Sequence, residues 1–407
     1  MVATSYPRFA GDTVGTFMEP IARGLAGRGH DVHMVLPWHP RWTRPHNEGG
    51  VTFHLFRYAP LPALNVFGYA GSLEADERLR GAAIAATPLA ALAGWRAARA
   101  VARKVNATVM HGHWVVPGGV IAAAAAGSRP LVVSLHGSDV FVAEKHAAVG
   151  HAARWALEKA QYVTACSEDL RRRALALGAT GERSRTIPYG VDSTRFRPDC
   201  EARARMRARW SFGESDELVL GVGRLVRKKG FEFLIDAIAR LAPRRPRLRL
   251  VLAGEGDLRG EFERRIAAHG VADRVLVPGV LLQDDVAAAL AAADVVAVPS
   301  VKDPSGNVDG LPNVVLEALA SGTALVASPA GGIGAVVRDG ETGLLVPEGD
   351  AAALGAALDR LLHDRELAER LGAAGRFWAQ SEGTWERAID AFDATYEIAC
   401  RRSNGRG

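Results

Sequence analysis

Short apolar segments alternate with longer segments of helical periodicity along almost the whole chain of 407 residues. In the second half, for example, LVLGVGR, LRLVLAGEG, VVAVPS and ALVASP are each long enough for one strand, and helical patterns lie between them. Strands that alternate with helices form parallel sheets with helices packed on both faces. The alternation therefore predicts an α/β protein, and because it runs through both halves of the chain, it predicts one architecture used twice.

Turn residues followed by an Arg-rich helix, in PYGVDSTRFRPDCEARARMR, mark the join between the two halves. We therefore expect an amino-terminal Rossmann-like domain over 1–194 and a carboxyl-terminal one over 195–382, two doubly wound parallel sheets that face each other across a cleft. The final amphipathic helix, 383–400, is expected to pack back on the first domain. The opening MVATSYP holds little apolar sequence, so we expect either that its strand starts further upstream or that the edge of the sheet is poorly built there.

Composition excludes several classes of protein. A hydrophobic share of 48% and a charged share of 23% are typical of a soluble globular chain. No apolar run is long enough to cross a bilayer and nothing resembles an export signal, so we expect a cytoplasmic protein. The three cysteines have neither paired nor metal-like spacing, which argues against a disulfide framework and a zinc site. The net charge of +5 is small for this length, and we expect no nucleic-acid partner.

The strand LVLGV leads into a candidate phosphate-binding loop. The residues that suit this role are Gly221, Gly223, Arg224, Lys228 and Lys229. Bare backbone and cations at the carboxyl end of a strand suit a diphosphate. A dinucleotide-binding fingerprint is the alternative, but Val226 replaces its third glycine, and the acid Glu255 lies about thirty residues on instead of roughly twenty. A surface turn with solvated cations is the structural alternative.

The segment DGLPNVVLEALASG, residues 309–322, places one acid before an apolar helix and another inside it. With Pro312 as the first helical residue, the amides of Asn313 and Val314 would form an anion site at the start of the helix. Glu317 would lie one turn further, where its carboxylate can accept hydrogen bonds from hydroxyl groups. Two acids beside a phosphate-binding helix start suit a nucleotide sugar. An ion pair between Glu317 and an arginine is the structural alternative.

Histidines follow two strands of the first half. His136 comes directly after LVVSL and just before a glycine and an acid, a position that favours function over simple packing. His113 and Trp114, in HGHWVVPGG, are read as a strand-to-helix turn with an aromatic plug. The sequence has no nucleophilic triad spacing, metal cluster or D-x-D pair, which argues against hydrolase chemistry and against a metal-bound diphosphate.

These motifs together carry a family resemblance. The chain resembles the retaining glycosyltransferases of family 4 (glycosyl transferases group 1), and the match runs in order over nearly its whole length. The segments that carry the resemblance are GRLVRKKG, the PS at 299–300, DGLPNVVLEALASG, GGIGAVVRDGETGLLVPEGD and, upstream, SLHGSDV and PYGVDSTRFRP. The resemblance implies the two-domain GT-B fold. It also implies transfer of a hexose from a UDP or GDP sugar to an acceptor hydroxyl, with no cofactor and no metal.

The resemblance also assigns roles to individual residues. Arg224 and Lys229 would hold the donor diphosphate, and Glu317 the ribose. Asp309 would contact the transferred sugar, although the family has Glu more often at this position, and His136 would line the reaction centre. The glycine loop around Gly15 would lie over the donor. The remaining residues expected to bind the donor follow Asp309: Gly310, Leu311, Asn313 and Val314.

The sequence leaves the acceptor open. A glycan or a lipid-linked glycan, in polysaccharide or glycolipid biosynthesis, fits the resemblance. The apolar stretch 58–71 and the basic stretch 243–249 suggest peripheral docking on the inner face of an anionic membrane, with a packed connection and a solvated turn as the plain alternative. Two other functions share the expected cleft. A nucleotide-sugar epimerase would convert the donor without an acceptor, and a non-catalytic nucleotide-sugar-binding protein would turn nothing over.

Overall fold

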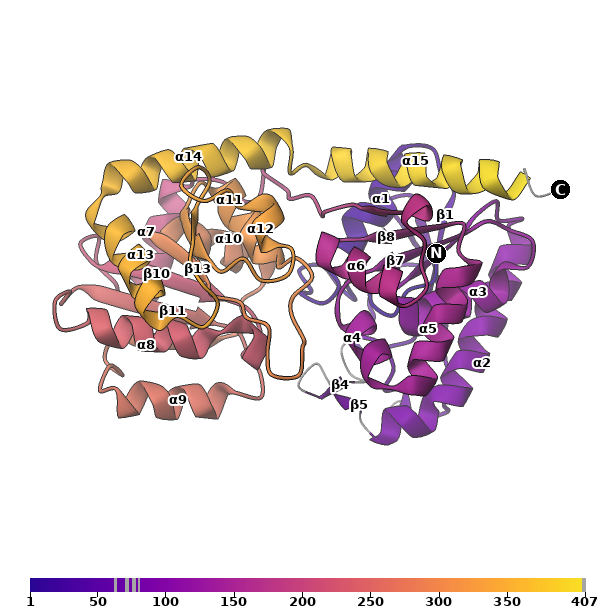
Figure 1. Ribbon diagram of the computed structural model, residues 1–407, viewed down its shortest axis with the longest axis horizontal. Helices are drawn as coiled ribbons and strands as arrows, with labels where there is room; N and C mark the ends of the chain where they lie inside the picture. Colours follow the sequence, from indigo (N-terminus) through magenta and orange to yellow (C-terminus); the bar gives the residue numbers. More distant parts are fainter. Residues whose placement is uncertain (62–63, 70–72, 75–77, 80, 405–407) are drawn as a thin grey trace. The chain divides into compact units, whose positions relative to one another are not determined.

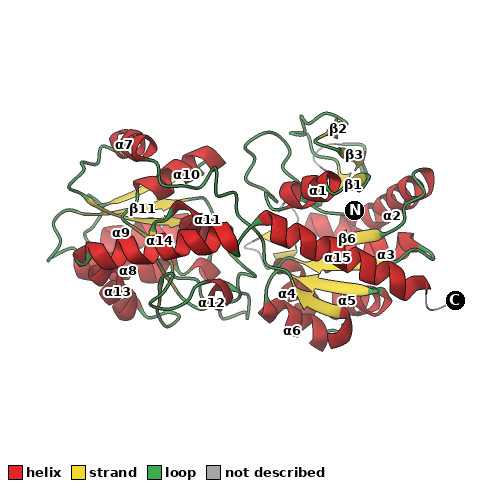
Figure 2. Ribbon diagram, turned by 90° about the horizontal axis from the view of Figure 1, so that it is seen from above, coloured by secondary structure: helices red, strands yellow, loops and turns green. Residues whose placement is uncertain are grey.

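The computed structural model describes residues 1–61, 64–69, 73–74, 78–79 and 81–404 (Figure 1). The chain divides into two compact units. The first comprises Met1–Tyr189 together with the chain from Trp385 onward, and the second comprises Gly190–Thr384. Both are parallel sheets covered by helices, so the prediction of one α/β architecture used twice is confirmed (Figure 2). Among the described residues, none of the helices has the length and apolar character needed to cross a bilayer.

The sheet of the first unit has two parts. One has the order β1-β3-β2 and the other the order β6-β7-β8-β9, and every pairing is parallel except that of β2 with β3. The strands are β1 (Val32–Pro37), β2 (Asn47–Glu48), β3 (Val51–Phe56), β6 (Met110–His113), β7 (Leu131–Leu135), β8 (Tyr162–Ala165) and β9 (Ser184–Thr186). The short strands β4 (Leu73–Glu74) and β5 (Arg78–Leu79) pair separately and antiparallel.

The opening segment of the chain joins these two parts. Val2 forms parallel bridges to both Val35 and Gly112, and its amide donates to the carbonyl of His111 at 2.8 Å. MVATSYP thus occupies the central position of the sheet, although only one residue of it pairs in strand geometry. The segment therefore lies at the centre of the sheet, and the expectation that it forms a poorly built edge is wrong.

Helices cover the first sheet on both sides. They are α1 (Met18–Gly27), α2 (Gly81–Lys104), α3 (Val120–Ala126), α4 (Ser138–Lys145), α5 (Ala147–Lys159), α6 (Glu168–Ala176) and α15 (Trp385–Asn404), with short turns of other helix types at Val115–Gly119 and Gly181–Arg183. The last helix, α15, belongs to this unit and packs beside α1. Tyr396 anchors it, since its buried hydroxyl group lies 2.6 Å from Nδ1 of His111 in β6.

The second unit has one sheet of six parallel strands in the order β12-β11-β10-β13-β14-β15. The strands are β10 (Glu217–Val222), β11 (Leu248–Ala253), β12 (Val275–Gly279), β13 (Val295–Val298), β14 (Ala324–Ala327) and β15 (Leu344–Leu345). Because the strand order reverses between β10 and β13, the loops that follow these two strands open a crevice at the carboxyl edge, where α/β sheets bind ligands.

The helices of the second unit are α7 (Cys200–Arg209), α8 (Phe231–Leu241), α9 (Arg259–Ala268), α10 (Gln283–Ala292), α11 (Asn313–Ser321), α12 (Ile333–Val336), α13 (Ala351–His363) and α14 (Arg365–Ser381). Helix α8 shows why they form: Phe231, Leu234, Ile235, Ile238 and Leu241 recur at helical spacing and are all buried against the sheet. Asp350 caps α13 by accepting from the amides two and three residues on at 2.9 Å each.

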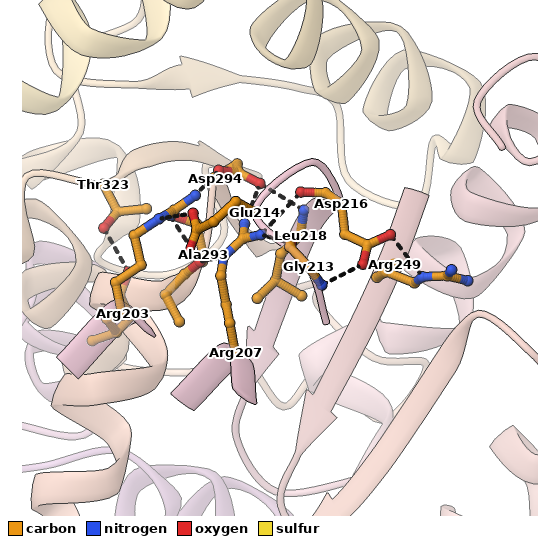
Figure 3. Close-up of polar contacts among 12 residues, drawn as sticks. Arg203, Arg207, Gly213, Glu214, Asp216, Leu218, Arg249, Ala293, Asp294 and Thr323 are labelled. Atoms are coloured by element: carbon orange, nitrogen blue, oxygen red, sulfur yellow. Dashed lines mark hydrogen bonds and ion pairs between the residues drawn. The ribbon is translucent and has the colours of Figure 1, made fainter. Parts of the chain in front are cut away.

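A buried arginine ties the amino edge of this sheet together (Figure 3). The side chain of Arg207, in α7, is only 1% exposed. Its guanidinium group donates to the Asp294 carboxylate at 2.8 Å and to three carbonyl groups, those of Gly213, Asp216 and Ala292. Asp294 also accepts from the amide of Leu218 at 2.7 Å. One charged group therefore connects α7, the start of β10 and the end of α10.

Replacing Arg207 by Met should lower the free energy of unfolding by roughly 3–5 kcal/mol, because it removes one donor of the Asp294 carboxylate and leaves three buried carbonyl groups without the guanidinium group. The matched control is Arg205→Met, since Arg205 is exposed on the same helix and its ion pair with Glu201 is long, at 3.5 Å. Urea denaturation of both variants measures the difference. Equal effects of the two substitutions would show that the Arg207 contacts do not stabilise the unit.

Candidate functional site

The candidate site lies at the carboxyl edge of the second sheet, where the loops after β10, β13 and β14 meet. After β10 the chain makes a short 3-10 turn at Arg227–Lys229 and reaches Gly230, which has φ of +65°. A Cβ atom at Gly230 would lie 1.9 Å from the carbonyl oxygen of Pro299, in the loop after β13. Only glycine permits this approach, and the amide of Val301 then donates to the carbonyl of Lys228 at 2.9 Å.

A second glycine brings the loop after β14 to the same place. Gly331 has φ of +60°, and a Cβ atom there would lie 1.8 Å from the carbonyl oxygen of Asp309. The basic loop, the segment that ends in Asp309 and the glycine-rich loop after β14 are thus held against one another by backbone contacts. Side chains on these loops are fixed in position before any ligand arrives.

The closest charged contacts of the site join Asp309 to two lysines. Nζ of Lys229 lies 2.6 Å from Oδ2 of Asp309, and Nζ of Lys228 lies 3.2 Å from Oδ1. All three side chains are at most 14% exposed. Burial alone would raise the pKa of the Asp309 carboxyl, but the ammonium groups of Lys229 and Lys228 outweigh it and hold the pKa well below its usual range. The group is an ionised, buried cluster with one excess positive charge.

Helix α11 begins four residues after Asp309. It starts at Asn313, and Pro312 has extended geometry with ψ of 124°. The sequence prediction of Pro312 as the first helical residue is therefore wrong by one position: the carbonyl of Pro312 accepts from the amide of Val315 at 3.1 Å, so Pro312 is the cap. A proline suits a cap because its fixed φ and missing amide cost nothing there. The start of α11 still lies in the segment that carries the lysine-bound Asp309.

Glu317 lies on α11 among buried apolar residues and is itself half-buried. It makes no hydrogen bond or ion pair with any residue that the structure describes. The structural alternative, an ion pair with an arginine, is therefore not what the described residues form. Burial raises the pKa of Glu317 to about 7, although the positive charges of Lys229 and Arg195 oppose the rise. A carboxylate held in this way has its acceptor capacity available for a ligand.

The other predicted donor-binding residues lie on the same loops. Arg224 directly follows the glycine turn after β10 and is exposed. Gly310 and Leu311 connect Asp309 to the helix cap, and Leu311 and Val314 are buried. Asn313 is the first residue of α11. The structure thus brings eight predicted residues to one edge of the second unit: Arg224, Lys229, Asp309, Gly310, Leu311, Asn313, Val314 and Glu317.

His136 lies in the first unit, at the carboxyl end of β7. Both of its ring nitrogens are occupied: Nε2 lies 3.1 Å from Nδ1 of His113, and Nδ1 lies 2.7 Å from the hydroxyl group of Tyr189. Burial lowers the pKa of the His136 imidazole to about 3, so the ring is neutral near pH 7. Its ring stacks with that of His113 at 5.3 Å between centroids.

Sequence reasoning missed two residues of these clusters. His113 was read as part of a turn, yet it is fully buried and hydrogen-bonded to His136. The signal was available, because both histidines end neighbouring parallel strands, whose carboxyl ends lie side by side. Lys228 received no role of its own, yet it binds Asp309. Gly15 lies in the first unit, with φ of +66°, in the turn that leads into α1, where it packs against Ser5.

Two family profiles match the chain: "Glycosyltransferase Family 4" over residues 14–195 and "Glycosyl transferases group 1" over residues 202–378. Among curated proteins, the GDP-mannose-dependent alpha-(1-6)-phosphatidylinositol monomannoside mannosyltransferase of Mycolicibacterium smegmatis is 36% identical over 265 residues, 64% of this chain and 68% of that protein. The enzyme of the same name from Mycobacterium tuberculosis is 37% identical over 49% of this chain and 52% of its own length.

Matches over the whole chain are more distant. The N-acetyl-alpha-D-glucosaminyl L-malate synthase of Bacillus anthracis is 25% identical over 97% of this chain and 95% of that protein. The crystal structure of Anabaena HepE in complex with UDP superposes with a TM-score of 0.76 at 19% identity, and covers 97% of this chain and 98% of that one. The fold of the two units is GT-B, the fold of nucleotide-sugar-dependent glycosyltransferases. The chain belongs to glycosyltransferase family 4.

Replacing Glu317 by Gln should stabilise the ligand-free protein at pH 8 by roughly 1–3 kcal/mol, because it removes a charge that has no partner. The folded-state pKa of about 7 lies above the ordinary value of 4.5, so the folded state binds more protons between these values. The stability of the wild type should therefore fall as pH rises from about 4.5 through about 7, and the Gln variant should lack this component.

Chemical denaturation at pH 5 and pH 8 measures this difference. Glu369→Gln is the control, since Glu369 is exposed on α14 and its substitution should change stability little at either pH. A Glu317→Gln variant that loses stability at pH 8 would mean that the carboxylate is a structural partner and not a ligand group.

Proposed function

We propose that this glycosyltransferase is a retaining hexosyltransferase that uses a nucleoside diphosphate hexose, without a divalent metal. The observation that carries the proposal is that a buried cationic cluster, Lys228 and Lys229, precedes a helix whose carboxylate, Glu317, has no hydrogen-bond or ion-pair partner among the described residues. Phosphate oxygens match the cations and the helix start, and ribose hydroxyls match the acceptor-only carboxylate. A nucleoside diphosphate carries both groups in one ligand.

The two lysines and the start of α11 support metal independence. A metal ion in other nucleotide-sugar enzymes neutralises the charge that develops on the leaving diphosphate. Here the ammonium groups of Lys228 and Lys229, the guanidinium group of Arg224 and the amides that begin α11 supply positive charge at the same edge of the sheet. Such fixed donors need no reorganisation during the reaction, which is why they stabilise a developing charge effectively.

The proposed reaction needs no protein nucleophile. The bond between the anomeric carbon and the diphosphate oxygen breaks, and the acceptor oxygen bonds to that carbon on the same face. The acceptor's proton passes to an oxygen of the departing diphosphate. Neutral His136 does not supply a proton in this scheme, since burial lowers its pKa to about 3 and both of its nitrogens are occupied by His113 and Tyr189. The chain contributes position and charge.

For the acceptor we propose a glycan or a lipid-linked glycan at the inner surface of a membrane. The name of the Mycolicibacterium smegmatis relative includes both GDP-mannose and phosphatidylinositol monomannoside, and this relative matches the chain over 68% of its length. GDP-hexoses and UDP-hexoses are therefore the donors to test. With a lipid-linked acceptor, the enzyme acts at the surface of a bilayer.

The function is tested by incubating the protein with GDP- and UDP-hexoses, with and without a lipid-linked glycan fraction, in excess chelator. We expect transfer only when acceptor is present, at a rate that the chelator does not change, and an anomeric configuration in the product equal to that of the donor. Conversion of the donor without acceptor would instead identify an epimerase. Loss of transfer in chelator with recovery in Mg²⁺ or Mn²⁺, or an inverted product, would contradict the proposal.

Single substitutions of Asp309 and of Lys229 should have different effects on turnover and on nucleotide affinity. Lys229→Met removes a phosphate contact, so both kcat/KM and nucleoside diphosphate affinity should fall, the former by about 10²-fold or more. Asp309→Asn should lower turnover strongly, because the carboxylate is proposed to contact the hexose. Its nucleotide affinity should hold or increase, since the substitution leaves both lysine charges unneutralised.

Turnover and nucleotide affinity of the two variants are measured in parallel by steady-state kinetics and calorimetry. An Asp309→Asn variant with wild-type turnover would make Asp309 only a counter-ion of the lysines. Unchanged nucleotide affinity in Lys229→Met would remove this lysine from the phosphate site.

A further inference from the structure

Helix α2 of the first unit carries a stripe of side chains that the glycosyl-transfer reaction does not use. Leu89, Leu92, Arg96, Arg99 and Arg103 follow each other at intervals of three, four, three and four residues. At 100° per residue this spacing places all five on one face, over a length of about 21 Å. Figure 1 shows α2 at the margin of its unit, and α3 and the β1 and β3 strands are its packing partners.

The arginines of this stripe, the α2 stripe, lie on a helix whose own sequence has no acidic residue. The helix contains Arg96, Arg99, Arg103 and Lys104, and no Asp or Glu over its 24 residues. In the part of the chain that the structure describes, none of the three stripe arginines forms an ion pair. Arg99 instead lies over the ring of Trp95, 5.7 Å from its centroid. The charges of Arg96 and Arg103 are therefore exposed and unpaired among the described residues.

The leucines of the stripe are exposed to an extent that is unusual for large apolar side chains. Leu89 is 58% exposed and Leu92 is 48% exposed. In the loop that precedes the helix, Leu61 and Leu64 are 61% and 51% exposed. Large exposed apolar side chains one turn apart, here toward the amino-terminal end of α2, mark an interaction surface.

A small apolar cavity lies between that loop and the same end of α2. Its lining includes Phe67 and Gly68 from the loop and Thr87, Ala90 and Ala91 from the helix. Of the apolar stretch 58–71 that the sequence singles out, residues 62–63 and 70–71 lie outside the described residues.

The basic stretch 243–249 is a weaker candidate for the same role. Arg245 binds Glu217 at 2.7 Å and also binds Asp359, and Arg249 binds Asp216 at 3.2 Å. Arg244 reaches Asp359 at 3.7 Å. These arginines hold elements of the second unit together, so most of their charge is neutralised internally.

We propose that the α2 stripe docks this enzyme on an anionic lipid bilayer, with Leu89 and Leu92 inserted at the level of the headgroups and Arg96, Arg99 and Arg103 on lipid phosphates. The surface of such a bilayer is anionic at the headgroups and apolar beneath them. A helix with exposed basic residues, exposed leucines and no acidic residue matches both layers. An acidic protein would match the arginines but would leave the leucines unexplained. The inference deepens the proposed lipid-linked acceptor, although the binding itself does not depend on glycosyl transfer.

The test is sedimentation of the full-length protein with phosphatidylcholine vesicles that contain either no anionic lipid or about one third phosphatidylglycerol. We expect binding to the anionic vesicles only, and weaker binding as salt is raised. Arg96→Gln/Arg99→Gln/Arg103→Gln should weaken it by roughly 100-fold, as expected for three basic residues at such a surface. Leu89→Ser/Leu92→Ser should weaken it by about tenfold or more, because it removes the inserted apolar groups.

Arg244→Gln/Arg247→Gln is the matched control in the second unit and should bind vesicles like the wild type. Circular dichroism and thermal unfolding check that every variant is folded. The proposal is overturned if the wild type does not bind anionic vesicles at low salt, if the arginine variant binds like the wild type, or if the control loses as much as the stripe variants. Binding of polyglutamate without vesicle binding would overturn it in favour of an acidic protein partner. Because no donor or acceptor is present, these outcomes are independent of whether the proposed transfer reaction is correct.

Discussion

The ion pairs of Asp309 with Lys228 and Lys229 are the interaction on which the candidate site depends. Burying three charged groups is costly unless they compensate one another, and here the carboxylate lies within ion-pair distance of both ammonium groups. The pairs connect the loop after β10 to the segment that leads into α11. Glycines at 230 and 331 allow the backbones to come close enough for this contact. The excess positive charge of the cluster is what makes the site suitable for a diphosphate.

The architecture could be predicted from the sequence because its signal is local. Strands such as β10 and β13 are apolar on both faces, and buried parallel strands have this pattern whichever strands lie beside them. The central pairing of Val2 could not be predicted in the same way. MVATSYP has no strand pattern of its own, and its place in the sheet comes from partners at Val35 and Gly112, far along the chain. The helix cap at Pro312 differed by one residue, which is within the usual uncertainty of helix boundaries.

The candidate site could be predicted only in part, for a related reason. Glu317 stood out because a carboxylate within an apolar helix is conspicuous in sequence, and the structure leaves it without a partner among the described residues. The contact of Lys228 with Asp309 and that of His113 with His136 were not foreseen, because each joins loops that only the folded sheet brings together. Charge and spacing in a sequence identify which residues could act. Tertiary structure decides which of them meet.

Proton release on nucleotide binding tests the central claim, that Glu317 is a ligand group held ready without a partner. Calorimetric titration of the nucleoside diphosphate near pH 7, in buffers of different ionisation enthalpy, counts the protons released. With a pKa of about 7, Glu317 is about half protonated before binding, and hydrogen bonds from ribose hydroxyls favour its ionised form. The wild type should therefore release about half a proton more per site than the Glu317→Gln variant. The variant is the reference because protons lost by the phosphates are counted in both proteins. Equal release by the two proteins, with equal affinity, would contradict the assignment of Glu317 to the nucleotide.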